Sequence, residues 1–184
     1  MKKSYKNASL SEVVKGITCP LSLAEKDDCA VTAFAAACDV YYTQAHEFVE
    51  KHFHREPRKG LDGMEDVLEN IFHNKVLSLG RCSFKFFCLS EKDITSYYKV
   101  DGEPIRRRMT VKSFLQIFNK GSFIILVRGH VFAIVDGVLI DHPDEHFRPT
   151  RIVESAVRVT KVQNIGTQLE IPFPELDNQL QIKF

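Results

Sequence analysis

The sequence predicts an α+β domain in which N-terminal helices pack on a C-terminal antiparallel sheet. Up to about residue 74, apolar residues recur at three- and four-residue spacing, which is typical of amphipathic helices. Beyond that point the apolar runs shorten to strand length, and Asp136-Gly137 is a strong hairpin-turn signal. No repeat, low-complexity tract or linker divides the 184 residues, so we expect a single domain over 1–184, with an N-terminal segment at 1–25.

The helical signals combine capping residues with apolar periodicity. Asp28 is a candidate N-cap, Asp62 and Glu65 resemble a capping box, and Thr110 can cap a later helix. The predicted helices span 28–38, 43–53, 62–72 and 110–120.

The strand signals are short runs of β-branched and aromatic residues between turn residues. They predict strands or extended segments at 76–79, 84–89, 94–100, 122–127, 130–136, 138–141, 152–162, 169–173 and 180–184. The last two belong to an extended C-terminal segment, 168–184, which alternates polar and apolar residues. Such a segment can seal the sheet edge or pair with a neighbour, so a homo-oligomer or assembly through it is possible.

Composition and charge exclude several classes of partner. The 25 Lys and Arg nearly balance the 24 Asp and Glu, which argues against nucleic-acid or membrane-surface binding. The longest apolar stretches, 123–127 and 131–135, are too short to span a bilayer. Five cysteines without a C-x-x-C pair fit a reducing compartment, and the first ten residues have no apolar block typical of a secretory signal. We therefore expect a cytoplasmic location.

Cys29 is the first candidate for chemistry. A thiol in the first turn of a helix faces the positive end of the peptide dipoles, which stabilises the reactive thiolate. The alternative interpretation is that Cys29, like Cys38, is a small apolar residue on a packed helix. Cys19 precedes a proline in a predicted loop, and Cys82 and Cys88 belong to a strand region with no acid, base or helix end beside them.

His130 and Asp141 are the second candidate pair. His130 begins one strand of the predicted hairpin and Asp141 ends the next, so the two side chains can come within hydrogen-bonding reach. A carboxylate on one imidazole nitrogen leaves the other nitrogen free to act as a base. Asp136 competes for the same role, but turn aspartates usually bond their own backbone.

Taken together, these segments resemble the papain-like cysteine peptidase fold, and most closely its small bacterial and phage members with an Asn-Asp-Cys signature. The resemblance spans roughly 26–150. The segments that carry it are Asp27-Asp28-Cys29, 41–49, 57–60, 121–125, Gly129-His130 and Asp141-His142-Pro143.

The resemblance implies a thiol hydrolase that cleaves a peptide or isopeptide amide. Cys29 would be the nucleophile, His130 the general base and Asp141 the acid that orients the imidazole. The substrate would be a protein or peptide and no cofactor would be needed. A phage member would act in the host cytoplasm or as part of the virion.

One position departs from the family pattern. The relatives carry an asparagine two residues before the cysteine, where this chain has Asp27. A carboxylate there would repel a developing oxyanion. The remaining supporting residues are Asp28, Lys26 and Asp136, with Ser22 and the Cys29 amide as further donors. The alternative function is therefore a weak or inactive papain-like interaction module or virion component.

Two charged segments have simpler interpretations. Arg106-Arg107-Arg108 could meet a phosphate, but the balanced net charge favours a solvated loop between elements. The segment 141–146 is dense in potential ligands, and a divalent metal site on His142, Asp144 and His146 is an alternative. Its irregular spacing favours a solvated loop, so no metal is expected.

Overall fold

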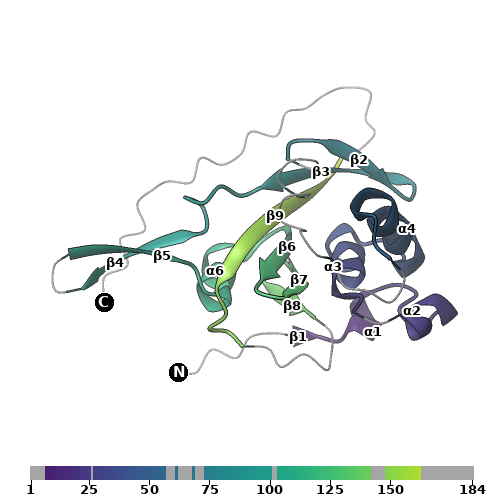
Figure 1. Ribbon diagram of the computed structural model, residues 1–184, viewed down its shortest axis with the longest axis horizontal. Helices are drawn as coiled ribbons and strands as arrows, with labels where there is room; N and C mark the ends of the chain where they lie inside the picture. The colour runs from purple at the N-terminus through teal and green to yellow at the C-terminus, as the bar shows by residue number, and fades with distance from the viewer. Residues whose placement is uncertain are drawn as a thin grey trace.

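The computed structural model describes residues 7–25, 27–56, 61, 68, 73–100, 103–141 and 148–162. Its architecture is α+β, as the sequence predicted, with the N-terminal helices on one face of a largely antiparallel sheet (Figure 1). No helix in these ranges is long and apolar enough to cross a membrane. The predicted helix over 62–72, apart from the buried Leu68, and the predicted strands at 169–173 and 180–184 lie outside the described residues.

The described part of the chain up to Phe53 is mostly helical. Its elements are β1 (Asn7–Ala8), α1 (Leu10–Val13), α2 (Pro20–Ala24), α3 (Cys29–Cys38) and α4 (Tyr42–Phe53). The bounds of α3 and α4 agree with the predicted helices within one residue. The three elements before α3 were not predicted, because each is too short to produce a periodic apolar pattern.

The main sheet has seven strands in the order β1-β8-β7-β6-β9-β3-β2. All neighbours are antiparallel except β1, which joins the edge parallel to β8 and so departs from the purely antiparallel expectation. The other members are β2 (Val76–Leu79), β3 (Cys82–Cys88), β6 (Ser122–Val127), β7 (His130–Val135), β8 (Val138–Ile140) and β9 (Val153–Val162).

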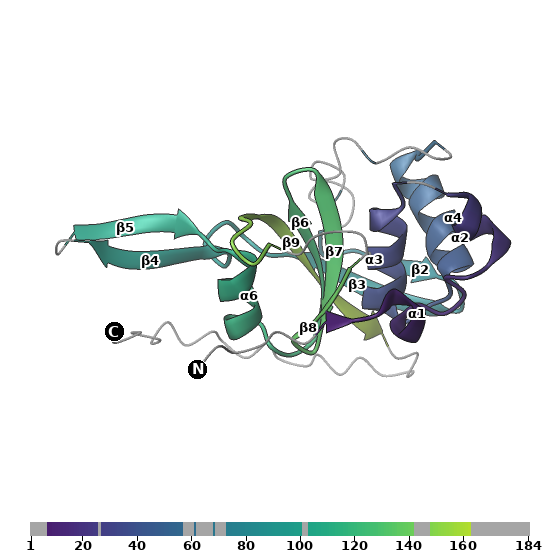
Figure 2. The ribbon, with the colours of Figure 1, turned by 90° about the horizontal axis from the view of Figure 1, so that it is seen from below.

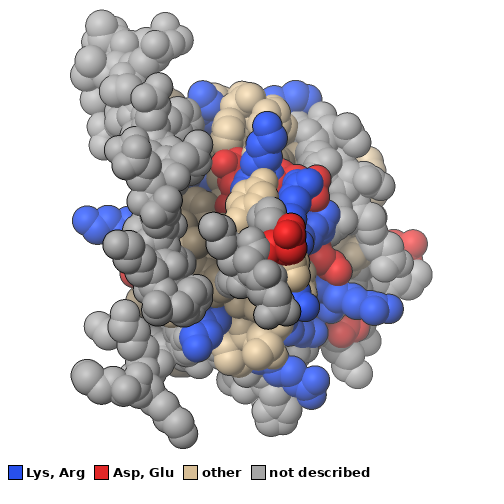
Figure 3. All heavy atoms as spheres, turned by 90° about the vertical axis from the view of Figure 1, so that its left-hand side faces the viewer, with Lys and Arg blue, Asp and Glu red and all other residues tan. Residues whose placement is uncertain are grey.

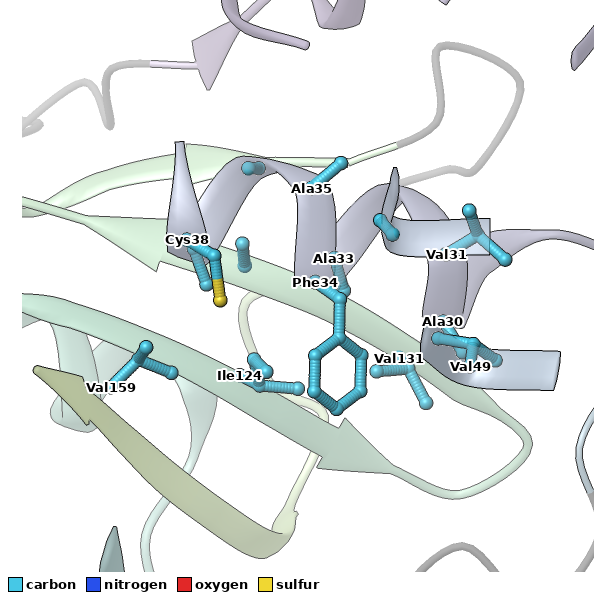
Figure 4. Packing of buried hydrophobic residues seen from close by; sticks show 14 of the residues in the cluster. Ala30, Val31, Ala33, Phe34, Ala35, Cys38, Val49, Ile124, Val131 and Val159 are labelled. Atoms are coloured by element: carbon cyan, nitrogen blue, oxygen red, sulfur yellow. The ribbon is translucent and has the colours of Figure 1, made fainter. Parts of the chain in front are cut away.

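Helix α3 is the centre of the larger core. All of its residues from Ala30 to Cys38 are buried, between the sheet and α4. Figure 4 shows Phe34 pointing from α3 toward the strands that carry Ile124 and Val131. The Phe34 ring also lies 5.4–5.9 Å, centroid to centroid, from the rings of Phe48, Phe53 and Phe86. Aromatic pairs at these separations add to the stabilisation from burial.

The opposite face of the sheet is covered by α6 (Val111–Ile117). Alternate residues of β6 therefore enter different cores: Ile124 and Leu126 face α3, whereas Phe123, Ile125 and Val127 belong to the cluster with α6. A strand buried on both faces needs apolar residues at every position. This arrangement explains the continuous apolar run at 123–127.

A two-stranded hairpin projects from the body of the molecule (Figures 1 and 2). It pairs β4 (Thr95–Val100) with β5 (Glu103–Arg108). The predicted loop at Arg106-Arg107-Arg108 was therefore wrong, because backbone pairing with 95–97 makes these arginines part of β5. Both faces of so thin a ribbon reach solvent, so it can carry charged side chains.

The arginines of the hairpin do not form an isolated positive patch. Arg106 lies 3.2 Å from a carboxylate oxygen of Glu91, and Arg108 donates to the carbonyl of Glu154. Figure 3, which faces this end of the molecule, shows Asp and Glu side chains among the Lys and Arg. On the face in view, positive and negative charge are therefore mixed.

The packing around Phe34 yields a stability prediction. Phe34→Ala would remove a fully buried ring from between α3, α4 and the sheet, and we expect a loss of about 3–5 kcal/mol in the free energy of unfolding. Urea unfolding followed by circular dichroism measures it. Tyr97→Ala is the control, because Tyr97 is 67% exposed. Equal losses in the two variants would contradict the assigned core.

Candidate active site

Cys29 is the first residue of α3, and its side chain is half-buried. Helix α3 packs along β7, so the start of the helix lies near the start of that strand. Cys38, at the other end of α3, is buried, and burial raises the pKa of its thiol far above the usual range. The two cysteines of α3 therefore differ in environment, and only Cys29 lies beside an ionisable partner.

The ionisable partner of Cys29 is His130, which belongs to the β7–β8 hairpin. Asp136 and Gly137 both adopt left-handed φ angles, of 48° and 74°, which close the tight turn that the sequence predicted. The turn brings the beginning of β7 back to the end of β8. His130 Nε2 consequently lies 2.7 Å from Asp141 Oδ1, and this confirms the predicted contact between the two side chains.

The second neighbour of His130 is Cys29, whose side chain raises the pKa of the imidazole through hydrogen bonding and charge. The three side chains therefore form a continuous chain of contacts from sulfur to imidazole to carboxylate. Only His130 is buried to 6% exposure, whereas Cys29 and Asp141 keep partial exposure.

The electrostatics of the site favour the charged imidazole. Burial by itself lowers the pKa of His130, but hydrogen bonds and the negative charges of Asp141 and Cys29 outweigh burial and raise this pKa to about 9. At neutral pH the imidazolium form of His130 is therefore favoured beside Asp141 and Cys29. A cation beside a thiol favours the thiolate, which is the nucleophilic form.

Asp28 is the N-cap residue of α3, as predicted, but its carboxylate makes no capping hydrogen bond to the helix. Instead it is buried and accepts a hydrogen bond of 2.8 Å from the hydroxyl of Tyr42. The bond to the Tyr42 hydroxyl replaces the local capping bond because it gives the buried Asp28 carboxylate a buried donor.

The other supporting residues are not all brought to this site. Asp27 is exposed and has a left-handed φ of 52°. Asp136 lies at the far end of β7 from His130, and its carboxylate accepts from the Gly121 amide at 2.9 Å. The structure therefore does not bring Asp136 to His130, because its carboxylate bonds the backbone just before β6. Lys26 lies outside the described residues, and Ser22 is half-buried within α2.

The residues for the alternative metal site, His142, Asp144 and His146, lie outside the described part of the chain. Within the described ranges, no group of three His, Cys, Asp or Glu side chains could hold a metal ion. Sequence reasoning missed Tyr42, because nothing local indicates that its hydroxyl meets Asp28, fourteen positions earlier.

Comparisons with protein-family models, curated proteins and solved structures found no match to this chain.

The contact between His130 and Asp141 predicts how the imidazole titrates. Asp141→Asn removes the negative charge while keeping the side-chain shape, so we expect the pKa of His130 to fall from about 9. An NMR titration of the imidazole measures the shift. Asp136→Asn is the matched control, because the same change in the turn should leave the His130 titration unaltered.

Asp141→Asn also tests how the contact between His130 and Asp141 contributes to the stability of the fold. A histidine whose pKa is higher in the folded protein stabilises the fold fully below pH ~6.5, and this contribution is lost as the pH rises through about 9. Asp141→Asn should therefore cost more unfolding free energy at pH 6 than at pH 10. A pH-independent cost would show that the charge of Asp141 does not act on His130.

Proposed function

We propose that this chain is a papain-like thiol hydrolase that cleaves a peptide or isopeptide amide of a protein or peptide substrate. The observation that carries the proposal is the chain of contacts from Cys29 through His130 to Asp141. The packing of the elements supports the proposal as well, since the helix that begins with Cys29 packs against the strand that begins with His130. The assignment to small bacterial or phage members, and to the cytoplasm, rests on the sequence resemblance.

The reaction proceeds by acyl transfer in two halves. Cys29 Sγ attacks the amide carbon while His130 holds the thiol proton, and the tetrahedral intermediate collapses as the C–N bond breaks and the imidazolium protonates the leaving amine. The product of this half is a thioester on Cys29. Water then attacks the thioester, His130 accepts its proton, and the acid leaves as the thiol is restored. Asp141 keeps the ring oriented and stabilises its charged form.

Thiol alkylation provides the direct test. At pH 7 iodoacetamide should modify Cys29 faster than Cys82, which is also half-buried but lies on β3, away from a helix start, and serves as the internal control. His130→Ala should slow alkylation of Cys29 by about ten-fold or more, because a nearby cation favours the thiolate. Peptide mapping by mass spectrometry gives the rate at each cysteine.

The pH dependence sharpens this test. The imidazolium loses its proton as the pH passes about 9, and thiols ionise without help in that range. The ratio of wild-type to His130→Ala rates should therefore be largest near neutral pH and approach one at high pH. Equal labelling of Cys29 and Cys82, insensitive to His130, would overturn the proposed nucleophile.

A second candidate function, a papain-like module that binds a partner without catalysis, is favoured by one observation. An exposed carboxylate, Asp27, stands where the resembling proteins carry an asparagine. A negative charge opposes the oxyanion of acyl transfer, whereas an amide stabilises it.

Asp27→Asn distinguishes the two candidate functions. We expect it to raise the rate at which p-nitrophenyl acetate acylates Cys29 by about ten-fold, because it replaces a repelling charge by a donor. Stopped-flow release of p-nitrophenolate measures the rate, and Asp39→Asn, at the far end of α3, is the control for a lost surface charge. Acylation of Cys29 in the variant but none in the natural chain would favour the binding module.

A further inference from the structure

The connection that leads into Cys29 is held at both ends by α4. This connection, 25–28, runs from Glu25, the C-cap of α2, to Asp28, the N-cap of α3. Tyr42 and His46 stand one turn apart on α4, so they share the face that meets the connection. Tyr42 binds Asp28 and His46 binds Glu25.

The end at Glu25 is fixed by a buried ion cluster. Arg55, just beyond α4, places Nη2 2.9 Å from Glu25 Oε2, and His46 Nε2 lies 3.3 Å from Glu25 Oε1. The three side chains are between 1% and 9% exposed. Charged side chains in such surroundings are confined to the geometry that pairs them. The start of the connection is therefore fixed relative to α4.

The end at Asp28 depends on a single hydroxyl. Tyr42 is fully buried, and its hydroxyl donates to Asp28 Oδ2 at 2.8 Å. An N-cap aspartate ordinarily turns its carboxylate toward the amides of the first helical turn. Here the hydroxyl holds the carboxylate in another direction, and α3 begins without a side-chain cap.

The first turn of α3 consequently keeps amide donors beside Cys29 that no described side chain caps. The first backbone hydrogen bond of the helix joins the Thr32 amide to the Asp28 carbonyl at 3.0 Å. The amides of Cys29, Ala30 and Val31 therefore have no acceptor inside the helix. Backbone amides next to a nucleophile are the donors that stabilise an oxyanion in acyl transfer.

We propose that Tyr42 is a positioning residue for the chemistry of Cys29. Its hydroxyl keeps the Asp28 carboxylate away from the first-turn amides of α3, so that these amides can bind the oxyanion that forms on the substrate carbonyl. The inference rests on the proposed thiol hydrolase function and explains how the chain can supply oxyanion donors although Asp27 replaces an amide side chain.

Removal of the hydroxyl leads to a specific rearrangement. In Tyr42→Phe the Asp28 carboxylate remains buried but loses its donor, and the nearest replacements are the first-turn amides of α3. The carboxylate then occupies the donors and places a negative charge where the oxyanion would form. Alkylation at Sγ needs no oxyanion, so the two types of reaction respond differently.

The experiment compares acylation with alkylation at the same sulfur. p-Nitrophenyl acetate transfers its acetyl group to Cys29: the S–C bond forms, the C–O bond to p-nitrophenolate breaks, and the thiol proton passes to His130. Iodoacetamide displaces iodide at a saturated carbon instead. Acid quenching and mass spectrometry give both rates for Cys29, and their ratio reports the oxyanion donors separately from the reactivity of the thiol.

Four variants of the full chain complete the test: Tyr42→Phe, Asp28→Ala, the double variant, and Tyr41→Phe. Tyr41→Phe is the matched control, since it makes the same chemical change one residue earlier, at a side chain that is 58% exposed. We expect Tyr42→Phe to lower the ratio of acylation to alkylation by about ten-fold or more. Asp28→Ala in the Tyr42→Phe background should restore most of it, because alanine has no carboxylate to occupy the amides.

Each outcome is decisive. Equal loss of acylation and alkylation in Tyr42→Phe, an unchanged ratio, or no recovery in the double variant would overturn the role of Tyr42. If circular dichroism shows that Tyr42→Phe does not fold, the test uses wild type, Asp28→Ala and the double variant instead. All three should keep the wild-type ratio of acylation to alkylation within about two-fold. A ten-fold loss in Asp28→Ala would also overturn the proposal.

Failure of the hydrolase function would appear separately, as Cys29 reactivity in the wild type that does not depend on His130.

Discussion

The burial of α3 between the sheet and α4 is the constraint on which the candidate site depends. Its sequence, Cys-Ala-Val-Thr-Ala-Phe-Ala-Ala-Ala-Cys, consists mostly of small side chains, with Phe34 as the only large one. Small residues allow a helix to approach both a sheet and another helix closely, and the dense packing leaves it little freedom to shift. Because α3 packs along β7, its first residue is held near the residue that begins the strand. The contact between Cys29 and His130 thus follows from core packing, although the two residues are a hundred positions apart.

Electrostatics impose a second constraint, because acidic residues stand in the connection before Cys29 as well as beside His130. Each of three carboxylates has a different binding partner. Asp141 binds His130, Glu25 binds Arg55 and His46, and Asp28 binds a tyrosine hydroxyl. Asp27 remains exposed to water, where its charge is screened. The protonated form of His130 is therefore favoured by its two neighbours while other acidic groups are bound to partners of their own.

The contacts that could be predicted from the sequence are those fixed by local rules, such as turn geometry and helical periodicity. A two-residue turn fixes which residues of a hairpin are neighbours, so the contact between His130 and Asp141 followed from Asp136-Gly137 alone. The helical period similarly placed Cys29 in a first turn. The link between Tyr42 and Asp28 could not be predicted, because it depends on how α4 packs beside α3. Capping preference even indicated the opposite orientation for Asp28, since a local rule cannot include a distant hydroxyl. For the same reason β5 was assigned to a loop: its charged residues lack an apolar pattern, and only pairing with β4 makes it a strand.

Helix α4 shows how the core and the candidate site are mechanically joined. One of its faces carries Ala45, Phe48, Val49 and Phe53 into the core that surrounds Phe34, while Tyr42 and His46 meet the connection before Cys29. A rigid helix cannot move one face without the other, so any repacking around Phe48 or Phe53 also displaces the partners of Glu25 and Asp28. Tyr42 and His46 are the buried polar side chains of α4, and their burial has a desolvation cost that apolar residues would avoid. Both contact the connection before Cys29, so they help to define where Glu25 and Asp28 lie.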